Sequence, residues 1–547
     1  MTTLADNTLS LWQEEGNQLI QQNLAVFRSL VTQAKDFVDR DNYDMGAVYG
    51  EMAATYASSK HCGLFVSWEL ERILLSIGKK VLRSNTNSSE NCSSREMPKK
   101  VLHVATSMKS IGGHSRMLWR WIQQDTERSH SLVLTRQAPT VVPKLLNDAV
   151  SNSGGRIYQL NTRIGSIISW AKQLRKIAID ADLVVLHTHS SDVIPIIAFS
   201  EKECLPPVIL IDHADHLFWL GASISDIVVG LRESGMRLAQ ERRHIEPKRN
   251  VLLPIILEPT QRVLSRAEAK RQLGIPEDSI LLLSIARAVK YKTIDGISFA
   301  DAHVPLLQQH QQAILVVIGP GEREDWSEAI RLTQGRIKVL SETEHTSVFY
   351  QAADIYVDSF PFVSNTSLLE AGSYGVPLIS RYPYSSDACG VLGADMPGLT
   401  GNLVCVRNLE EYTATLSQLI ENTEFRLGLG EATRNKIVET HYGDDWQRSL
   451  NSVYSCIATL AKVSSIANLE DKICLSELDV FLPKVHDIDV DDDKLIQWHM
   501  SLMPTAERLF YWFNLLKKNS LHKNPLNLLA PEWLRSRYYL LRLHYYS

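Results

Sequence analysis

Residues 357–380, VDSFPFVSNTSLLEAGSYGVPLIS, form the stretch with the clearest chemical potential. The pattern predicts a strand ending at Asp358, a short polar loop, and a helix beginning near Leu368. A helix that starts just beyond the carboxyl end of a strand leaves its first N–H groups unpaired and directs the positive end of its dipole there. This stretch therefore predicts a seat for a phosphate group.

The side chains at the start of this helix fit a nucleotide. Thr366 and Ser367 follow Asn365 and would add hydroxyl donors to a phosphate seat. Glu370 lies one turn later on the same face and could accept hydrogen bonds from a ribose diol. An alternative is a capping box, in which Ser367 and Glu370 satisfy only the backbone of their own helix.

The composition is that of an ordinary globular protein. The 547 residues include 44% hydrophobic and 22% charged residues, and the formal net charge is -5. This length predicts several domains, and this charge gives no reason to expect nucleic-acid binding. No apolar run approaches the length of a membrane span, and the first residues lack a signal-peptide pattern, so we expect a cytoplasmic protein.

Metal binding is not expected from the sequence. The seven cysteines form an odd, scattered set without a CxxC pair, which favours reduced thiols over a zinc site or disulfides. The segments LHTHSSD (186–192) and IDHADH (211–216) are rich in histidine and aspartate, but nothing in their spacing fixes a tetrahedral ligand set.

The order of apolar runs predicts the domain organisation. Strands that alternate with helices indicate βαβ units and a doubly wound parallel sheet, and this rhythm occurs twice along the chain. The terminal regions show helical spacing instead. We predict an N-terminal helical domain at 1–84, a linker at 85–98, two Rossmann-like domains at 99–256 and 257–462, and a C-terminal helical extension at 463–547.

The tandem of Rossmann-like domains resembles the GT-B glycosyltransferases over roughly residues 100–460. The order of motifs carries this likeness: a glycine-rich first loop, histidines after the middle strands, a basic loop, and the motif at 357–380. The resemblance implies an α/β fold with two Rossmann-like domains facing a cleft and helical extensions at both ends. The second domain is similar both to retaining family-4 enzymes and to the O-GlcNAc-transferase type.

The basic loop SIARAVKYKTIDG places Arg287 and Lys292 five residues apart, as in the pair that holds the donor diphosphate in family-4 enzymes. Two cations near a helix N-terminus would stabilise a departing nucleoside diphosphate without a metal ion. The alternative is an ordinary basic loop on the surface.

The motif Asn365-Thr366-Ser367-Leu368-Leu369-Glu370 fits the O-GlcNAc-transferase type, where the resemblance implies phosphate binding by the two hydroxyl residues and ribose binding by the glutamate. Family-4 enzymes have a second glutamate eight positions earlier, where this chain has Phe362. This departure leaves retention and inversion of the anomeric configuration both open, with a slight preference for inversion.

The first Rossmann-like domain supplies the candidates for the sugar and acceptor side. Gly113 lies in a loop that looks like the glycine loop near the donor phosphates, and His114 could orient the acceptor or act as a base. His213 lies where family-4 enzymes place a histidine near the transferred sugar. The alternatives are a cap of the next helix for His114, and helix capping by Asp212 or Asp215 at the second site.

The resemblance implies a glycosyltransferase, of the hexosyl or GlcNAc type, that uses a nucleotide sugar, expected to carry UDP, as substrate without a metal or cofactor. The acceptor is a protein, glycan or lipid, and the helical extensions are candidate surfaces for a protein partner. Two alternatives stay open. One is a catalytically silent GT-B subunit that binds a glycan or a protein, and the other is a nucleotide-sugar epimerase.

Overall fold

A computed structural model describes residues 2–82, 97–110, 112–137, 140–202, 205–293, 296–382, 392–459, 469–518, 520 and 525–536. Contacts divide the chain into two compact units. Unit 1 consists of Met1–Glu14, Arg232–Ser234 and Pro254–Arg448, and unit 2 of Glu15–Leu231, Gly235–Leu253 and Ser449–Ser547. Of the predicted linker, only residues 97 and 98 lie within the described residues.

The sheet of unit 2 has seven parallel strands in the order β3-β2-β1-β4-β5-β6-β7. The inner strands are apolar and buried along almost their whole length, as parallel sheets covered on both faces require. The strands are β1 (Lys100–Ala105), β2 (Ser129–Leu134), β3 (Ile157–Gln159), β4 (Leu183–His187), β5 (Val208–Asp212), β6 (Ile227–Gly230) and β7 (Asn250–Leu252).

Helices connect most of these strands in the alternating order that the sequence predicts, but β6 follows β5 without a helix between them. The segments that leave the carboxyl ends of β1, β4 and β5 lie at one edge of the parallel sheet. The connections contain α4 (Gly113–Gln124), α5 (Lys144–Asn152), α6 (Ile167–Ala178), α7 (Ile194–Ala198), α8 (Glu233–Arg243), η1 (Leu160–Thr162) and η2 (Pro247–Arg249).

Parts of the N- and C-terminal helical regions share one hydrophobic core with the sheet of unit 2. Trp68 near the N-terminus, Leu102 on β1 and Leu495 near the C-terminus are buried in the same cluster, and Trp533 packs against it. Residues 537–547 lie outside the described residues. The terminal helices are α1 (Thr2–Asp39), α2 (Tyr43–Ser59), α3 (Trp68–Val81), α17 (Gly443–Thr459), α18 (Glu477–Val485), α19 (Asp492–His499), η6 (Met500–Leu502), α20 (Thr505–Lys517) and η7 (Pro525–Leu529).

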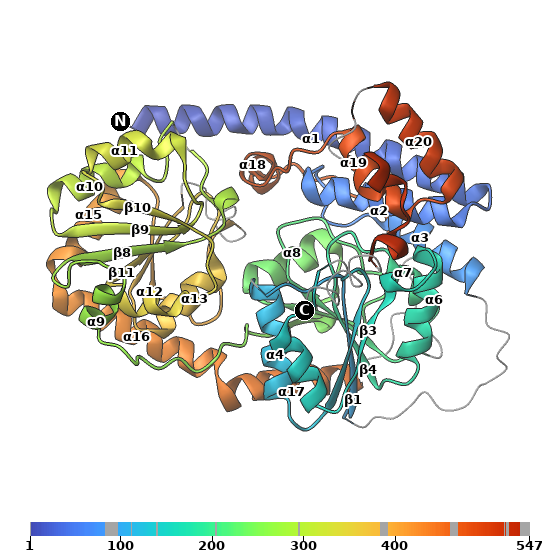
Figure 1. The fold of residues 1–547 in the computed structure, drawn as a ribbon, viewed down its shortest axis with the longest axis horizontal. Coiled ribbons are helices and arrows are strands. Elements are labelled where there is room, and N and C mark those ends of the chain that lie inside the picture. The colour runs from blue at the N-terminus through green and yellow to red at the C-terminus, as the bar shows by residue number, and fades with distance from the viewer. Residues whose placement is uncertain are drawn as a thin grey trace. The chain divides into compact units, whose positions relative to one another are not determined.

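The sheet of unit 1 has six parallel strands in the order β10-β9-β8-β11-β12-β13, which confirms the second doubly wound domain. Figure 1 shows α10 and α11 on one side of this sheet and α12 and α13 on the other. The strands are β8 (Ile280–Ile285), β9 (Ala313–Gly319), β10 (Ile337–Ser341), β11 (Ile355–Val357), β12 (Leu378–Arg381) and β13 (Leu403–Val406).

The helices of unit 1 bury aliphatic and aromatic side chains against this sheet in a separate core that includes Leu282, Trp326 and Tyr412. They are α9 (Arg266–Gln272), η3 (Ala288–Lys290), η4 (Asp301–His303), α10 (Val304–Gln309), η5 (Glu324–Trp326), α11 (Ser327–Leu332), α12 (Ser347–Ala352), α13 (Asn365–Ser373), α15 (Leu409–Glu421) and α16 (Thr423–His441). Within the described residues, no helix combines the length and the apolar composition that crossing a bilayer requires.

Candidate functional site

Helix α13 begins one turn earlier than the sequence predicts. Its N-cap is Ser364, and its first helical hydrogen bond runs from the Leu368 N–H to the Ser364 carbonyl at 3.0 Å. The N–H groups of Asn365, Thr366 and Ser367 therefore precede the first helical bond and lie in the turn where an α-helix has unpaired donors. The three predicted phosphate-binding residues are brought together at this helix start.

The capping-box alternative for Ser367 and Glu370 is wrong. Ser367 is the third residue of the helix, and no side-chain cap bond is formed at the helix start. The Ser367 hydroxyl accepts instead from the Ser364 hydroxyl at 3.1 Å. The Glu370 carboxylate accepts from the Tyr350 hydroxyl at 3.3 Å. Neither of these two bonds uses a backbone N–H group of the helix start.

The buried carboxylate of Asp358 holds the loop that leads into α13. It accepts from the backbone N–H groups of Ser359 and Ser364, both at 2.9 Å, and from the Ser380 hydroxyl at 2.8 Å. Burial raises the pKa of Asp358 to about 6, against the opposing effect of these hydrogen bonds. Beyond this braced loop, the Asn365 Oδ1 atom is buried without a hydrogen-bond partner among the described residues.

A basic loop from the end of β8 packs against the same turn. Tyr291 forms an antiparallel bridge with Pro361, which joins the basic loop to the loop before α13. Arg287 is exposed at the start of η3, and Lys292 is partly exposed just after the bridge. The two predicted cations therefore flank a contact with the loop that leads to the helix N-terminus.

Lys290 is a third cation that the sequence reasoning missed. Its Nζ atom donates to the Val363 carbonyl at 2.6 Å and lies 5.0 Å from the centre of the Phe362 ring. Burial lowers the pKa of Lys290 to about 8, with the charge of Asp358 acting in the opposite direction. The sequence contains three cations within residues 287–292, which could have indicated Lys290. The prediction used only the outer two, because their five-residue spacing matches the pair in family-4 enzymes.

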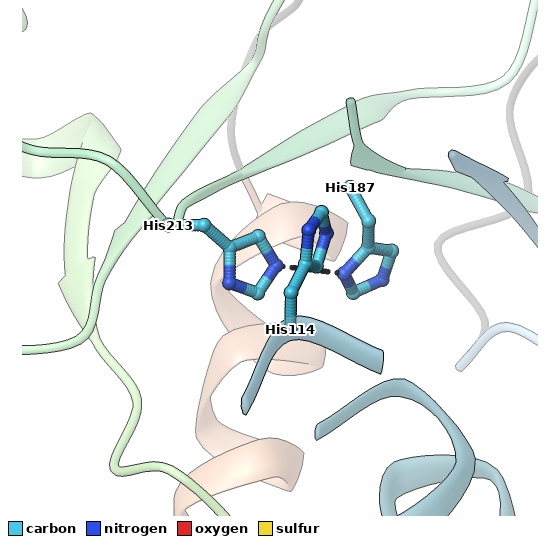
Figure 2. Close-up of side chains that lie close together, drawn as sticks. All are labelled: His114, His187 and His213. Carbon is cyan, nitrogen blue, oxygen red and sulfur yellow. Dashed lines mark hydrogen bonds between the residues drawn. The ribbon is translucent and has the colours of Figure 1, made fainter. Parts of the chain in front are cut away.

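In unit 2, His114 and His213 are brought together with His187, as Figure 2 shows. His187 ends β4 and His213 follows β5, so both lie at the carboxyl edge of the sheet. His187 Nδ1 lies 3.1 Å from His213 Nε2, and the ring centres of His114 and His213 are 3.9 Å apart. Gly113 is the first residue of α4, after Gly112 with its φ of 129° that favours glycine.

Both alternative explanations of these histidines are wrong. His114 lies inside α4, whose N-cap is Gly112 and which has no side-chain cap bond. His213 is followed by turns, and Asp212 accepts from the Ala214 N–H at 3.3 Å without a helix beginning there. Within the described residues, the next helix is α8.

The three imidazoles are held in their neutral form. Burial, followed by the charge of nearby His189, lowers the pKa of His114 to about 3. Burial, followed by neighbouring histidines, also holds the pKa of His187 and His213 well below the ordinary value. At neutral pH each ring therefore offers one N–H donor and one lone pair.

One nitrogen from each of these three histidines lies within 4.8 Å of the others, which makes the group a candidate for a metal ion. Imidazoles that share a zinc ion have Zn–N distances of about 2.0–2.1 Å and rings that diverge from the ion, so their ring centres are farther apart than their ligand nitrogens. The His114 and His213 ring centres lie only 3.9 Å apart, with the rings tilted at 41° to each other. The cluster as it stands resembles hydrogen-bonded imidazoles more than a ligand set.

Comparisons with known proteins agree with this fold. Residues 265–436, all in unit 1, match the family described as "Glycosyl transferases group 1". A D-inositol 3-phosphate glycosyltransferase of Thermobifida fusca is 28% identical over 190 residues, which cover 31% of this chain and 41% of that relative. The chain therefore matches less than half the length of this curated relative.

Two solved structures are similar in fold. A glycosyltransferase of Rickettsia africae has a TM-score of 0.53 at 13% identity, covering 66% of this chain and 99% of its own. The Anabaena protein HepE in complex with UDP has a TM-score of 0.51 at 12% identity, covering 65% and 99%. The chain has the GT-B glycosyltransferase fold, and its unit 1 contains the segment that matches group 1 glycosyl transferases.

Proposed function

We propose that this protein is a metal-independent glycosyltransferase that moves a sugar from a nucleotide-diphosphate donor, carrying UDP, to an acceptor. The observation that carries the proposal is the start of α13. Three backbone N–H groups precede its first helical hydrogen bond, and Thr366 and Ser367 add their hydroxyls there. The Tyr291–Pro361 bridge joins the basic loop to the loop that leads into this helix. The complex of HepE with UDP supports uridine as the nucleoside of the donor.

Unit 1 binds the diphosphate and ribose in this proposal. Arg287 and Lys292 neutralise the diphosphate as the sugar leaves, because negative charge develops there in the transition state. Asn365, with Thr366 and Ser367, donates or orients hydrogen bonds at the helix start. Glu370 accepts from the ribose hydroxyls, next to the Tyr350 hydroxyl that it already binds.

Unit 2 supplies the groups for the sugar and the acceptor. Gly113 permits a close approach of the backbone to the donor, and His114 and His213 present imidazole nitrogens. Both rings stay neutral because burial lowers their pKa values, so they act as hydrogen-bond partners rather than as fixed positive charges.

A cytoplasmic location and a role of the terminal helices in binding a protein partner belong to the same proposal. The described cysteines Cys62, Cys405, Cys456 and Cys474 are free thiols, which is typical of a reducing compartment.

Turnover of a panel of nucleotide sugars in EDTA tests the function. A transferase releases the nucleoside diphosphate from its donor. Without another acceptor it still does so slowly, because water takes the place of the acceptor and the donor is hydrolysed. We expect release of UDP from at least one UDP-sugar, with a marked loss in Lys292→Ala. Conversion of one nucleotide sugar to another without release would show an epimerase. Tight binding of a glycan or protein with no turnover would show a silent subunit, and either result would refute the proposal.

Gly319 provides a prediction about the backbone that carries Arg287. Its φ is 117°, and a Cβ atom at this position would lie 2.0 Å from the Ala286 carbonyl oxygen. In Gly319→Ala we expect this contact to displace Ala286, the residue before Arg287. The basic loop then loses its alignment with α13, so UDP should bind about tenfold more weakly. Calorimetry measures this affinity.

Gly335→Ala is the matched control for this experiment. Gly335 also has a positive φ, of 75°, but a Cβ atom would meet nothing within 4 Å. This variant should lose about 1 kcal/mol of stability from backbone strain and bind UDP as the wild type does. Equal loss of UDP affinity in both variants would mean that general destabilisation, rather than the position of the basic loop, is responsible.

A further inference from the structure

A chain of four imidazoles crosses the sheet of unit 2 towards the histidine cluster. His130 Nδ1 lies 3.0 Å from His103 Nε2, His103 Nδ1 lies 3.1 Å from His187 Nε2, and His187 Nδ1 lies 3.1 Å from His213 Nε2. These residues come from β2, β1, β4 and the loop after β5, which are neighbours in the sheet in that order. Figure 2 shows the last bond of the chain, between His187 and His213.

The far end of the chain fixes its direction. His130 Nε2 lies 3.1 Å from the Asp125 backbone carbonyl and 3.4 Å from the Asp125 carboxylate. Both are acceptors, so His130 Nε2 must carry a proton. Burial alone would raise the pKa of Asp125, but hydrogen bonds from His130 and Tyr454 and the charge of Arg128 lower it, which keeps the carboxylate ionised.

In a chain of neutral imidazoles, each ring passes this direction on to the next. Because His130 donates through Nε2, its Nδ1 accepts from His103, whose Nδ1 in turn accepts from His187. His187 Nδ1 then accepts from His213 Nε2. The rings of His103, His130 and His187 are fully buried, so a reversed link would leave two lone pairs or two N–H groups facing each other without water.

We propose that this chain locks His213 in the tautomer with its proton on Nε2 and its lone pair on Nδ1, so that the site accepts a hydrogen bond from a hydroxyl group of the acceptor. His103 and His130 act as positioning residues in this inference, which rests on the proposed transfer function. The substrate that accepts the sugar is therefore an alcohol. A hydroxyl group can donate a hydrogen bond to the lone pair of His213, whereas a group with only lone pairs cannot.

His114 supports the same conclusion independently. Its Nε2 atom is buried without a hydrogen-bond partner among the described residues, and its ring centre lies 3.9 Å from that of His213. A neutral His114 with its proton on Nδ1 presents a lone pair at this nitrogen as well. A substrate that supplies a hydrogen-bond donor would satisfy such a buried, unpartnered nitrogen.

Nitrogen-15 NMR of the histidine-labelled full-length protein reads the tautomers directly, without any ligand. The His213 signals are assigned from their disappearance in His213→Gln. We expect a protonated Nε2 and an unprotonated Nδ1 in the wild type at neutral pH. A wild-type His213 with its proton on Nδ1, or with both tautomers mixed, would overturn the proposal even if no variant were made.

Two variants at one position separate locking from packing. His103→Phe keeps a ring against Trp121, whose ring centre lies 5.6 Å away, but removes the acceptor for His187. His103→Asn places an amide oxygen near the former Nδ1 atom and can accept from His187 again. We expect His213 to become a mixture of tautomers in the first variant and to return to the Nε2–H form in the second.

The same variants are compared in UDP release from a UDP-sugar, with water or glycerol as the hydroxyl compound. We expect kcat to fall on the order of tenfold to a hundredfold in His103→Phe with an unchanged KM for the donor, and to recover largely in His103→Asn. The lock would be refuted if His103→Phe had the same kcat and the same His213 tautomer as the wild type. It would also be refuted if His103→Phe and His103→Asn lost kcat equally.

Zinc analysis and nucleotide binding complete the test. One equivalent of zinc retained by the wild type and lost in His114→Ala would contradict the proposal, because the lone pairs would then belong to an ion. If UDP does not bind, the proposed function fails while the NMR result still decides whether the lock exists. If UDP binds and the tautomer is not locked, only this further inference fails.

Discussion

Lys292→Ala and Arg287→Ala are each expected to lower kcat/KM for the UDP-sugar about a hundredfold, which corresponds to about 2.7 kcal/mol of transition-state stabilisation. The reason is the charge that develops on the diphosphate as the sugar leaves, which no metal ion neutralises in this account. The two residues lie on either side of the Tyr291–Pro361 bridge to the loop before α13. Steady-state kinetics with a fixed acceptor measures the effect.

Lys338→Ala is the control for these variants. Lys338 is exposed on the edge strand β10 of the same unit, away from the basic loop in the sheet order. Its replacement changes the net charge by the same amount and should leave kcat/KM within twofold of the wild type. If all three variants lost activity equally, a general charge effect would replace the specific contact to the diphosphate.

Asp479→Ala should destabilise unit 2 by about 3–5 kcal/mol, the largest stability effect that we expect. The Asp479 carboxylate on α18 is buried and accepts from Arg242 at 2.6 Å and 3.0 Å and from His61 at 2.9 Å. It also accepts from Ser476. Its removal leaves the Arg242 guanidinium, whose side chain is only 11% exposed, without this anion, and it removes the bonds from the C-terminal extension to α8 and to His61. Denaturant unfolding measures the loss.

Asp489→Ala is the matched control, because this carboxylate belongs to the same extension but is 89% exposed in its pair with Lys494. A surface pair of this kind contributes about 0–1 kcal/mol, so stability should change little. Similar losses in both variants would mean that the buried network around Asp479 is no more important than a surface charge.

The pKa of Asp479 also predicts how stability depends on pH. Burial alone would raise this pKa, but hydrogen bonds and charges from His61 and Arg242 lower it from 3.8 to about 2. A depressed folded pKa means that the contribution, about 2 kcal/mol, is present above the unfolded pKa and is lost as pH falls from about 4 towards 2. The gap in stability between the wild type and Asp479→Asn should therefore narrow over this interval.

The sheets were predictable from the sequence because buried parallel strands are continuous apolar runs. The apolar run LVVLH forms β4, and the apolar run AILVVIG forms β9. The start of α13 was placed a turn too late, since Ser367 and Glu370 imitate a capping box. The backbone begins the helix earlier because Asp358 binds the Ser364 N–H and fixes the loop there.

The remaining site residues depend on contacts that one sequence does not specify. Lys290 became important only through its bond to Val363, 73 positions away in the chain. His103 and His130 look like ordinary strand residues, and their imidazole chain exists only because β2, β1 and β4 are neighbours in the sheet. Strand order is set by tertiary packing, so the spacing of these histidines gave no signal.

The central claim is that the start of α13 and the basic loop bind a nucleoside diphosphate without a metal ion. Calorimetric titration of UDP and UMP in EDTA, with the wild type and Lys292→Ala, tests it most directly. The account predicts that UDP binds the wild type at least tenfold more tightly than UMP does, and that Lys292→Ala removes this difference. Absence of UDP binding by the wild type, or binding unaffected by the substitution, would contradict the account.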